Sequence, residues 1–167
     1  NGLSEKIIGK FFKIKKNRKD ITIVSKIHGD LSKKTIEKCI HESLIRMNTD
    51  HIDYYGITHD PNTNLDEILE VMDRFQKEGK ILRVACNNYD ISMLKSSKKI
   101  QETNNFSKFG LLETVYNVLY RGVEKDLINY CDLENIDIIS YSPLGEGFIT
   151  GNYKNGQVST KKTRFDI

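Results

Sequence analysis

Polar side chains follow several apolar stretches of this sequence, and their types could support chemistry on a small molecule. Lys26 and His59 each end such a stretch, and Asn88 and Tyr141 end two others. A lysine or histidine at the end of a buried strand is unusual, because each buried polar group needs a partner. An ammonium group lowers the pKa of a neighbouring phenol, and a neutral imidazole can donate a hydrogen bond to a carbonyl oxygen. These residue types suggest carbonyl chemistry, although each is also an ordinary choice at the start of a loop.

The stretches that must position these residues are short and rich in β-forming residues. The sequence predicts five strands, at residues 21–25, 52–58, 81–86, 111–116 and 136–141. Helical patterns lie between them, which is typical of repeated βα units with a parallel sheet. The α/β pattern fits an open doubly wound sheet or part of a barrel, and composition does not choose between them. In either architecture, functional residues gather at the C-terminal ends of the strands.

Capping residues predict where the helices begin and end. Ser4, Ser32, Asn64 and Asp90 each precede a helical pattern. Their side-chain oxygens can accept hydrogen bonds from the free backbone N–H groups of a first turn, so we expect them as N-caps. Gly79 follows another helical pattern, where we expect it to take the left-handed conformation.

The first predicted helix carries an apolar stripe and then a basic run. We expect Ile7, Ile8, Phe11 and Phe12 to pack inward. The cations at residues 13–19 complement the negative end of the helix dipole, which favours a solvated basic face. They do not indicate a nucleic-acid site, because no aromatic side chain is placed beside them to stack on bases.

The composition excludes several classes of protein. The chain has 167 residues, 38% hydrophobic and 29% charged, with a formal charge of +3, which is typical of one globular domain. We therefore expect a single domain over residues 1–167, with a loop-like tail at 152–167. No apolar run is long enough to cross a membrane. Three scattered cysteines without a CxxC pair favour neither a metal site nor disulfides, so we expect a cytoplasmic protein. The net charge is too mild to indicate a partner, so we expect neither a nucleic-acid nor a membrane partner.

Short motifs that follow one another along the chain carry a family resemblance. They are Gly-Leu-Ser-Glu at 2–5, Ile-Ile-Gly at 7–9, Val-Ser-Lys at 24–26, Glu-Ser-Leu-Ile-Arg-Met-Asn-Thr-Asp-His-Ile-Asp-Tyr-Tyr at 42–55, Thr-His-Asp-Pro at 58–61, Glu-Gly-Lys-Ile-Leu-Arg-Val-Ala-Cys-Asn-Asn at 78–88, Val-Tyr-Asn-Val-Leu at 115–119, Tyr-Ser-Pro-Leu-Gly-Glu-Gly at 141–147 and Thr-Gly-Asn-Tyr at 150–153. In these residues and their order the chain resembles the aldo-keto reductase superfamily. The resemblance implies a (β/α)8 TIM barrel, of which this chain would cover about five βα units.

The resemblance also implies a reaction and catalytic residues. The reaction is reversible hydride transfer between a nicotinamide cofactor, usually NADPH with NADH not excluded, and a small aldehyde or ketone. Lys26 matches the lysine that lies beside the general acid and lowers its pKa. His59 matches the histidine that orients the substrate carbonyl and polarises its oxygen.

Other matching residues are expected to hold the cofactor. Asn88 matches the asparagine that binds the nicotinamide carboxamide, and Tyr141 matches the aromatic residue that stacks on the ring. The turn after that strand matches the loop that contacts the pyrophosphate, because free N–H groups of a strand-to-helix loop suit an anion. The residues of this turn that we expect to take part are Ser142, Leu144 and Gly145.

The chain departs from the family pattern at three of these positions. Asn87 stands where the family usually has serine, and Ala85 replaces a common glycine. Glu113 stands where the family usually has a glutamine that contacts the carboxamide. An amide offers both a donor and an acceptor, whereas a carboxylate only accepts. We expect Asn87 and Glu113 still to contact the cofactor, through hydrogen bonds that differ from those of the family pattern.

The family's catalytic aspartate and tyrosine belong upstream of the motif at residues 2–5. On the resemblance, we expect the 167-residue chain alone to be inactive, and a longer gene product is favoured over a truncated relative. Two other functions stay open at this point. One is a non-catalytic cofactor-binding barrel like the potassium-channel β subunits of this superfamily, and the other is an inactive fragment.

Overall fold

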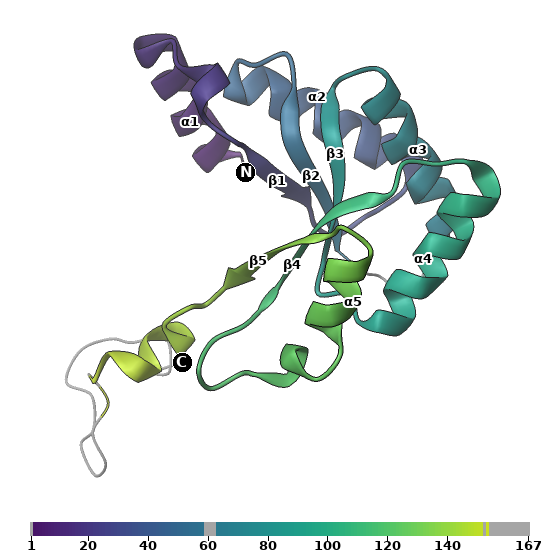
Figure 1. Ribbon diagram of the computed structural model, residues 1–167. Helices are drawn as coiled ribbons and strands as arrows, with labels where there is room; N and C mark the ends of the chain where they lie inside the picture. The colour runs from purple at the N-terminus through teal and green to yellow at the C-terminus, as the bar shows by residue number, and fades with distance from the viewer. Residues whose placement is uncertain (1, 59–62, 152, 154–167) are drawn as a thin grey trace.

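Helices and strands alternate along the chain in the computed structural model, which describes residues 2–58, 63–151 and 153. The expected tail at 152–167 lies outside these residues except for Tyr153. Figure 1 shows the elements in chain order. They are α1 Leu3–Lys15, the 3-10 turn η1 Arg18–Asp20, β1 Val24–Ile27, α2 Lys33–Met47, β2 Ile52–Thr58, α3 Leu65–Lys77, β3 Ile81–Asn87, α4 Ile91–Asn104, β4 Phe109–Val115, η2 Gly122–Glu124, α5 Leu127–Leu133, β5 Asp137–Tyr141 and η3 Gly145–Thr150.

The strands form one parallel sheet in the order β1-β2-β3-β4-β5. This confirms the α/β prediction and the five strands that the sequence indicates. The first strand begins at Val24, later than predicted, and β4 begins earlier, at Phe109. Consecutive helices lie side by side, α1 on α2, α2 on α3 and α3 on α4 (Figure 1). Each βα unit therefore adds one strand to the sheet and one helix to the layer that packs on it.

Two of the predicted helix caps are confirmed, a third is confirmed in position but lacks the capping hydrogen bond, and the fourth is wrong. Asn64 Oδ1 accepts from the Asp66 backbone N–H at 3.1 Å, and Asp90 Oδ1 accepts from the Met93 N–H at 2.8 Å. Ser32 precedes α2, but its hydroxyl bonds Asp30 and Thr35 side chains instead of a backbone N–H. Ser4 lies inside α1, which begins after Gly2 in the left-handed conformation. Gly79 takes the predicted left-handed conformation, with φ of 70°.

The prediction of an inward stripe on α1 is confirmed at Ile8 and Phe12 and wrong at Ile7 and Phe11. Phe12 and Gly9 are buried, whereas Ile7 and Phe11 are 60% and 41% exposed. A Cβ on Gly9 would lie 2.2 Å from the backbone oxygen of Arg46 in α2. The absence of a side chain at Gly9 lets the two helices approach closely.

Arg18 is not part of a solvated basic face. Its guanidinium donates to Thr49 Oγ1 at 2.8 Å, to the Ile21 oxygen at 2.7 Å and to Asp53 Oδ2 at 2.7 Å. The Asp53 carboxylate also accepts from the Ile23 backbone N–H at 2.8 Å. Because Ile21 and Thr49 lie just before β1 and β2, and Asp53 is the second residue of β2, Arg18 fixes the N-terminal ends of both strands.

The two faces of the sheet have different surroundings. The face toward the helices carries the main apolar core, including Ile57, Val84, Cys86 and Leu112, each at most 1% exposed. The opposite face, here called the inner face, carries Lys26, Gly56, Ala85, Leu111 and Glu113.

A register shift between Val84 and Ala85 places an extra residue in β4. Val84 pairs with Phe109, whereas Ala85 pairs with Leu111, so Gly110 is the additional residue. A residue inserted into one strand of a pair forms a β-bulge.

Candidate functional site

The ammonium group of Lys26 on β1 binds the carboxylate of Glu113 on β4. Lys26 Nζ lies 2.6 Å from Oε1 and 2.7 Å from Oε2 of Glu113. The two side chains are 31% and 19% exposed, so the pair is shielded from water on most sides. A charge-assisted contact of this geometry is stronger than a neutral hydrogen bond, and it fixes both side chains.

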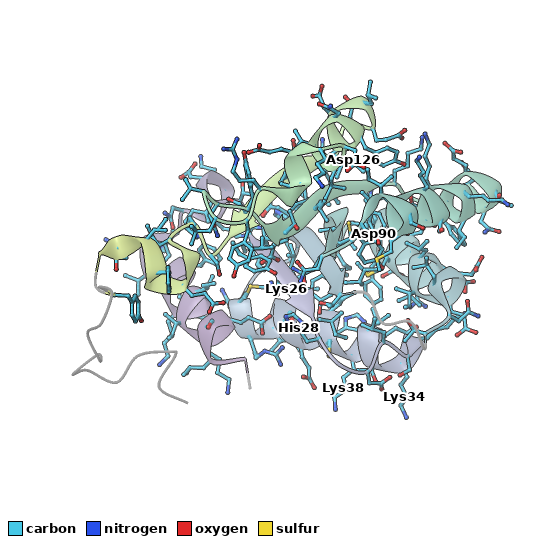
Figure 2. All side chains as sticks on the ribbon, turned by 90° about the horizontal axis from the view of Figure 1, so that it is seen from below. Lys26, His28, Lys34, Lys38, Asp90 and Asp126 are labelled. Carbon is cyan, nitrogen blue, oxygen red and sulfur yellow. The ribbon has the colours of Figure 1, made fainter. Side chains whose placement is uncertain are left out.

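This contact requires the sheet to curve. Strands β2 and β3 separate β1 from β4, and three interstrand spacings of a flat sheet amount to about 14 Å. The intervening strands carry Gly56, paired with Lys26, and Ala85, paired with Gly56. Small residues at these positions leave the inner face clear for the long side chains to meet. Figure 2 labels Lys26 within the molecule, whereas Lys34 and Lys38 of α2 project outward.

A continuous path of hydrogen bonds links the remaining strand ends to Glu113. The Tyr141 hydroxyl donates to Asn88 Oδ1 at 3.0 Å, and Asn88 Nδ2 donates to Asn87 Oδ1 at 3.2 Å. Asn87 Nδ2 lies 3.4 Å from the backbone oxygen of Glu113. The same oxygen accepts from the Asn88 backbone N–H at 2.8 Å. Five predicted site residues from four strands are therefore joined at one edge of the sheet.

Left-handed backbone conformations turn the chain directly after β3 and β5. Asn88 has φ of 57° and Ser142 has φ of 53°. Asparagine tolerates this conformation better than most residues do, whereas serine needs support from its surroundings. That support comes from Asn117, whose Nδ2 donates to the Ser142 backbone oxygen at 2.8 Å. The loops after β4 and β5 are thereby tied together.

The turn predicted to contact a pyrophosphate is compact and glycine-dependent. The Gly145 N–H donates to the Ser142 oxygen at 2.9 Å, and Gly145 is buried with φ of 56°. A Cβ on Gly145 would lie 3.1 Å from Leu119 Cδ1. Leu144 is 57% exposed and leaves the backbone of the turn open on that side.

The donor set fits a nicotinamide group. Asn87 and Asn88 offer two side-chain amides, which supply the donors and acceptors that a carboxamide needs. Tyr141 offers a partly exposed ring on the same edge. Both carboxylate oxygens of Glu113 accept from Lys26. Glu113 is therefore less available to a carboxamide than the amide expected at this position.

Tyr116, directly after β4, forms its hydrogen bond within the loop that follows. The hydroxyl of Tyr116 donates to Glu124 Oε1 at 2.8 Å, and this contact raises the pKa of Tyr116. Tyr116 therefore belongs to the loop after β4 and does not join the path described above. His59 lies outside the described residues, so its predicted role on the substrate carbonyl stays a prediction.

Sequence reasoning missed the direct contact between Lys26 and Glu113. It paired Lys26 with an upstream phenol and Glu113 with a carboxamide. The signal that could have revealed the contact is the placement of opposite charges at the ends of the first and fourth strands, with glycine and alanine between them. It becomes readable only when the sheet is known to curve.

The described residues contain neither a metal cluster nor a membrane helix. In residues 2–58, 63–151 and 153, no three His, Cys, Asp or Glu side chains gather in a way that could hold a metal ion. No helix within these same ranges has the length and apolar character needed to cross a membrane.

Comparisons with known proteins agree with this architecture. A crystal structure of an aldo/keto reductase from Klebsiella pneumoniae in complex with NADP and acetate superposes with a TM-score of 0.79 at 24% identity, covering 90% of this chain and 52% of that one. A second Klebsiella structure, in complex with NADPH, matches equally well. These neighbours are (β/α)8 barrels, so the five strands correspond to about half of a barrel.

Curated relatives match over the same share of their length. Protein tas of Escherichia coli K12 is 24% identical, covering 93% of this chain and 54% of the relative. Methylglyoxal reductase YeaE of the same organism is 27% identical, covering 93% and 52%. The chain thus spans about half the length of these two relatives. The family model described as "Aldo/keto reductase family" matches residues 1–166, and the chain belongs to that family.

Proposed function

We propose that this chain supplies the cofactor-holding part of a carbonyl reductase that uses NADPH. The observation that carries the proposal is the hydrogen-bonded path from Tyr141 through Asn88 and Asn87 to Glu113. It gathers amide, hydroxyl and ring groups at the C-terminal edge of the sheet, where parallel α/β folds bind ligands. The family assignment supports an oxidoreductase.

Each residue has a defined task in this proposal. Asn88 binds the carboxamide and sets which face of the ring is presented, while Tyr141 lies against the ring. Ser142, Leu144 and Gly145 place backbone and hydroxyl groups beside the pyrophosphate. When bound, the reduced cofactor supplies the hydride that adds to the carbonyl carbon. Lys26 stabilises charge next to the general acid, and His59 orients the carbonyl oxygen that takes up the proton.

Cofactor binding by the 167-residue chain tests the proposal. NADPH fluorescence is titrated with the unaltered chain, with Asn88→Ala and with the control Asn104→Ala, whose exposed side chain bonds only within α4. We expect saturable binding that Asn88→Ala weakens about tenfold, the value of one or two lost hydrogen bonds, and that Asn104→Ala leaves unchanged. Lack of binding by the unaltered, folded chain would contradict the proposal.

Turnover identifies the substrate class. Methylglyoxal appears in the names of two Escherichia coli relatives, one of them NADH-specific, so it is the first substrate to test with NADPH and with NADH. We expect reduction by the protein that contains the upstream tyrosine and aspartate, and loss on Lys26→Met. Cofactor binding without turnover of any aldehyde in a panel would instead favour the non-catalytic cofactor-binding barrel.

A further inference from the structure

Glu113 carries a charge where the family pattern has a neutral amide, and its carboxylate forms an ion pair with Lys26. Both carboxylate oxygens contact Lys26 Nζ, at 2.6 and 2.7 Å. The Glu113 side chain is 19% exposed, so water competes weakly for these oxygens. The two charges therefore act on their surroundings as a nearly neutral pair.

Small residues lie beside Lys26 on the inner face of the sheet. On the inner face, a Cβ at Gly56 would lie 3.3 Å from Lys26 Cβ and 3.7 Å from Ala85 Cβ. Gly56 has no side chain, and Ala85 contributes only a methyl group. A larger side chain at Gly56 would crowd the stem of Lys26.

The pair lies next to the residues proposed to hold the nicotinamide. The backbone oxygen of Glu113 accepts from both Asn87 and Asn88. Asn88 in turn accepts from Tyr141. A ring held by Asn88 and Tyr141 is then close to the ammonium and the carboxylate together. The oxidised ring carries a positive charge and the reduced ring does not, so an unbalanced charge here favours one form over the other.

We propose that Glu113 is a positioning residue that holds Lys26 as its counter-ion, and that the balance between the two charges keeps the site from favouring either the oxidised or the reduced cofactor. The inference rests on the proposed function. Removing the carboxylate leaves an unpaired cation, which disfavours the positively charged NADP⁺. Removing the ammonium leaves an unpaired anion, which favours it.

The contact itself is tested without cofactor. The rate of reductive methylation of Lys26 is followed by site-resolved mass spectrometry in the unaltered chain and in Glu113→Gln. Lys98 is the matched internal control, because it is 34% exposed and binds Glu134 at 2.6 Å. We expect Glu113→Gln to raise the rate at Lys26 about tenfold, the value of a charge-assisted hydrogen bond, and to leave Lys98 unchanged, with Glu134→Gln doing the reverse. An unchanged rate at Lys26 overturns the inference.

The consequence for the cofactor is tested by the ratio of two dissociation constants. The Kd of NADP⁺ divided by that of NADPH is measured for the unaltered chain, Glu113→Gln, Lys26→Met and the double variant. We expect the ratio to rise about fivefold in Glu113→Gln, to fall about fivefold in Lys26→Met, and to return near the starting value in the double variant. Equal ratios in all four overturn this inference alone, whereas absence of binding by the unaltered chain contradicts the proposed function and this inference with it.

Discussion

Substituting Gly9 by alanine probes how closely α1 packs on α2. The added Cβ would lie 2.2 Å from the Arg46 backbone oxygen and 2.9 Å from the carbonyl carbon of Met47. A carbon and an oxygen in contact lie at about 3.3 Å or more, so the helices must separate by about 1 Å. Overpacking of this kind costs about 1–3 kcal/mol, and the neighbouring atoms are backbone and cannot rotate away.

Alanine also has a better helix propensity than glycine, by about 1 kcal/mol. The clash lowers the free energy of unfolding and the propensity raises it. The larger of the two effects decides whether Gly9→Ala is destabilising. Because the distance is far below a normal contact, we expect the clash to dominate and Gly9→Ala to lower the free energy of unfolding by about 1–2 kcal/mol. Urea denaturation followed by circular dichroism measures this value.

A control and a coupled variant sharpen the test. Gly122→Ala is the control, since a Cβ there meets nothing within 4 Å, and we expect it to be neutral or slightly stabilising. Glu5 on α1 binds Arg46 Nε at 2.6 Å, a contact that separating the helices would weaken. Glu5→Gln should therefore cost less in Gly9→Ala than in the unaltered chain. A Gly9→Ala variant at least as stable as the original would refute the reasoning.

Three further predictions concern stability. Met72 is fully buried, and we expect Met72→Ala to lower the free energy of unfolding by about 2–5 kcal/mol in urea titrations, through lost contacts and a cavity. Arg18→Met should cost about 1–3 kcal/mol by the same measurement, because it leaves Asp53 without its guanidinium at 20% exposure. The Lys77 ammonium and the Ser107 N–H and hydroxyl hold the pKa of Asp73 below its ordinary 3.8 against the opposing effect of burial. These contacts contribute fully to the free energy of unfolding above about pH 4, and their contribution is lost as the pH falls through the lowered pKa. Between pH 5 and about pH 2, the Tm of Asp73→Asn should therefore fall less than that of the unaltered chain.

The order of elements was predictable because their signals are local. Each βα unit has an apolar stretch bounded by polar residues, and capping side chains such as Asn64 and Asp90 act within three residues of their own position. The choice between an open sheet and a barrel was not predictable from such patterns. It depends on curvature, which is a property of several strands together and is visible in the contact between Lys26 and Glu113.

The errors share one physical origin, which is contact between residues distant in sequence. The apolar stripe of α1 predicted an inward Phe11, but α1 packs on α2 through Gly9, and Phe11 is 41% exposed. Arg18 was predicted within a solvated face, yet its partners Thr49 and Asp53 follow more than thirty residues later. The candidate site was predictable as a set of strand ends, whereas its hydrogen-bonded path was not.

The extra residue in β4 reconciles two demands on one short strand. Phe109 packs toward Tyr89 in the helix-side core, with ring centroids 5.5 Å apart, while Glu113 reaches the opposite side of the sheet. Strict alternation would send positions 109 and 113 to the same side, since they differ by an even number. Because Gly110 is an additional residue, the side chains after it point to the side opposite to the one that strict alternation predicts. Deleting Gly110 would leave both side chains on their present sides of the sheet, because the two residues that remain between them restore strict alternation.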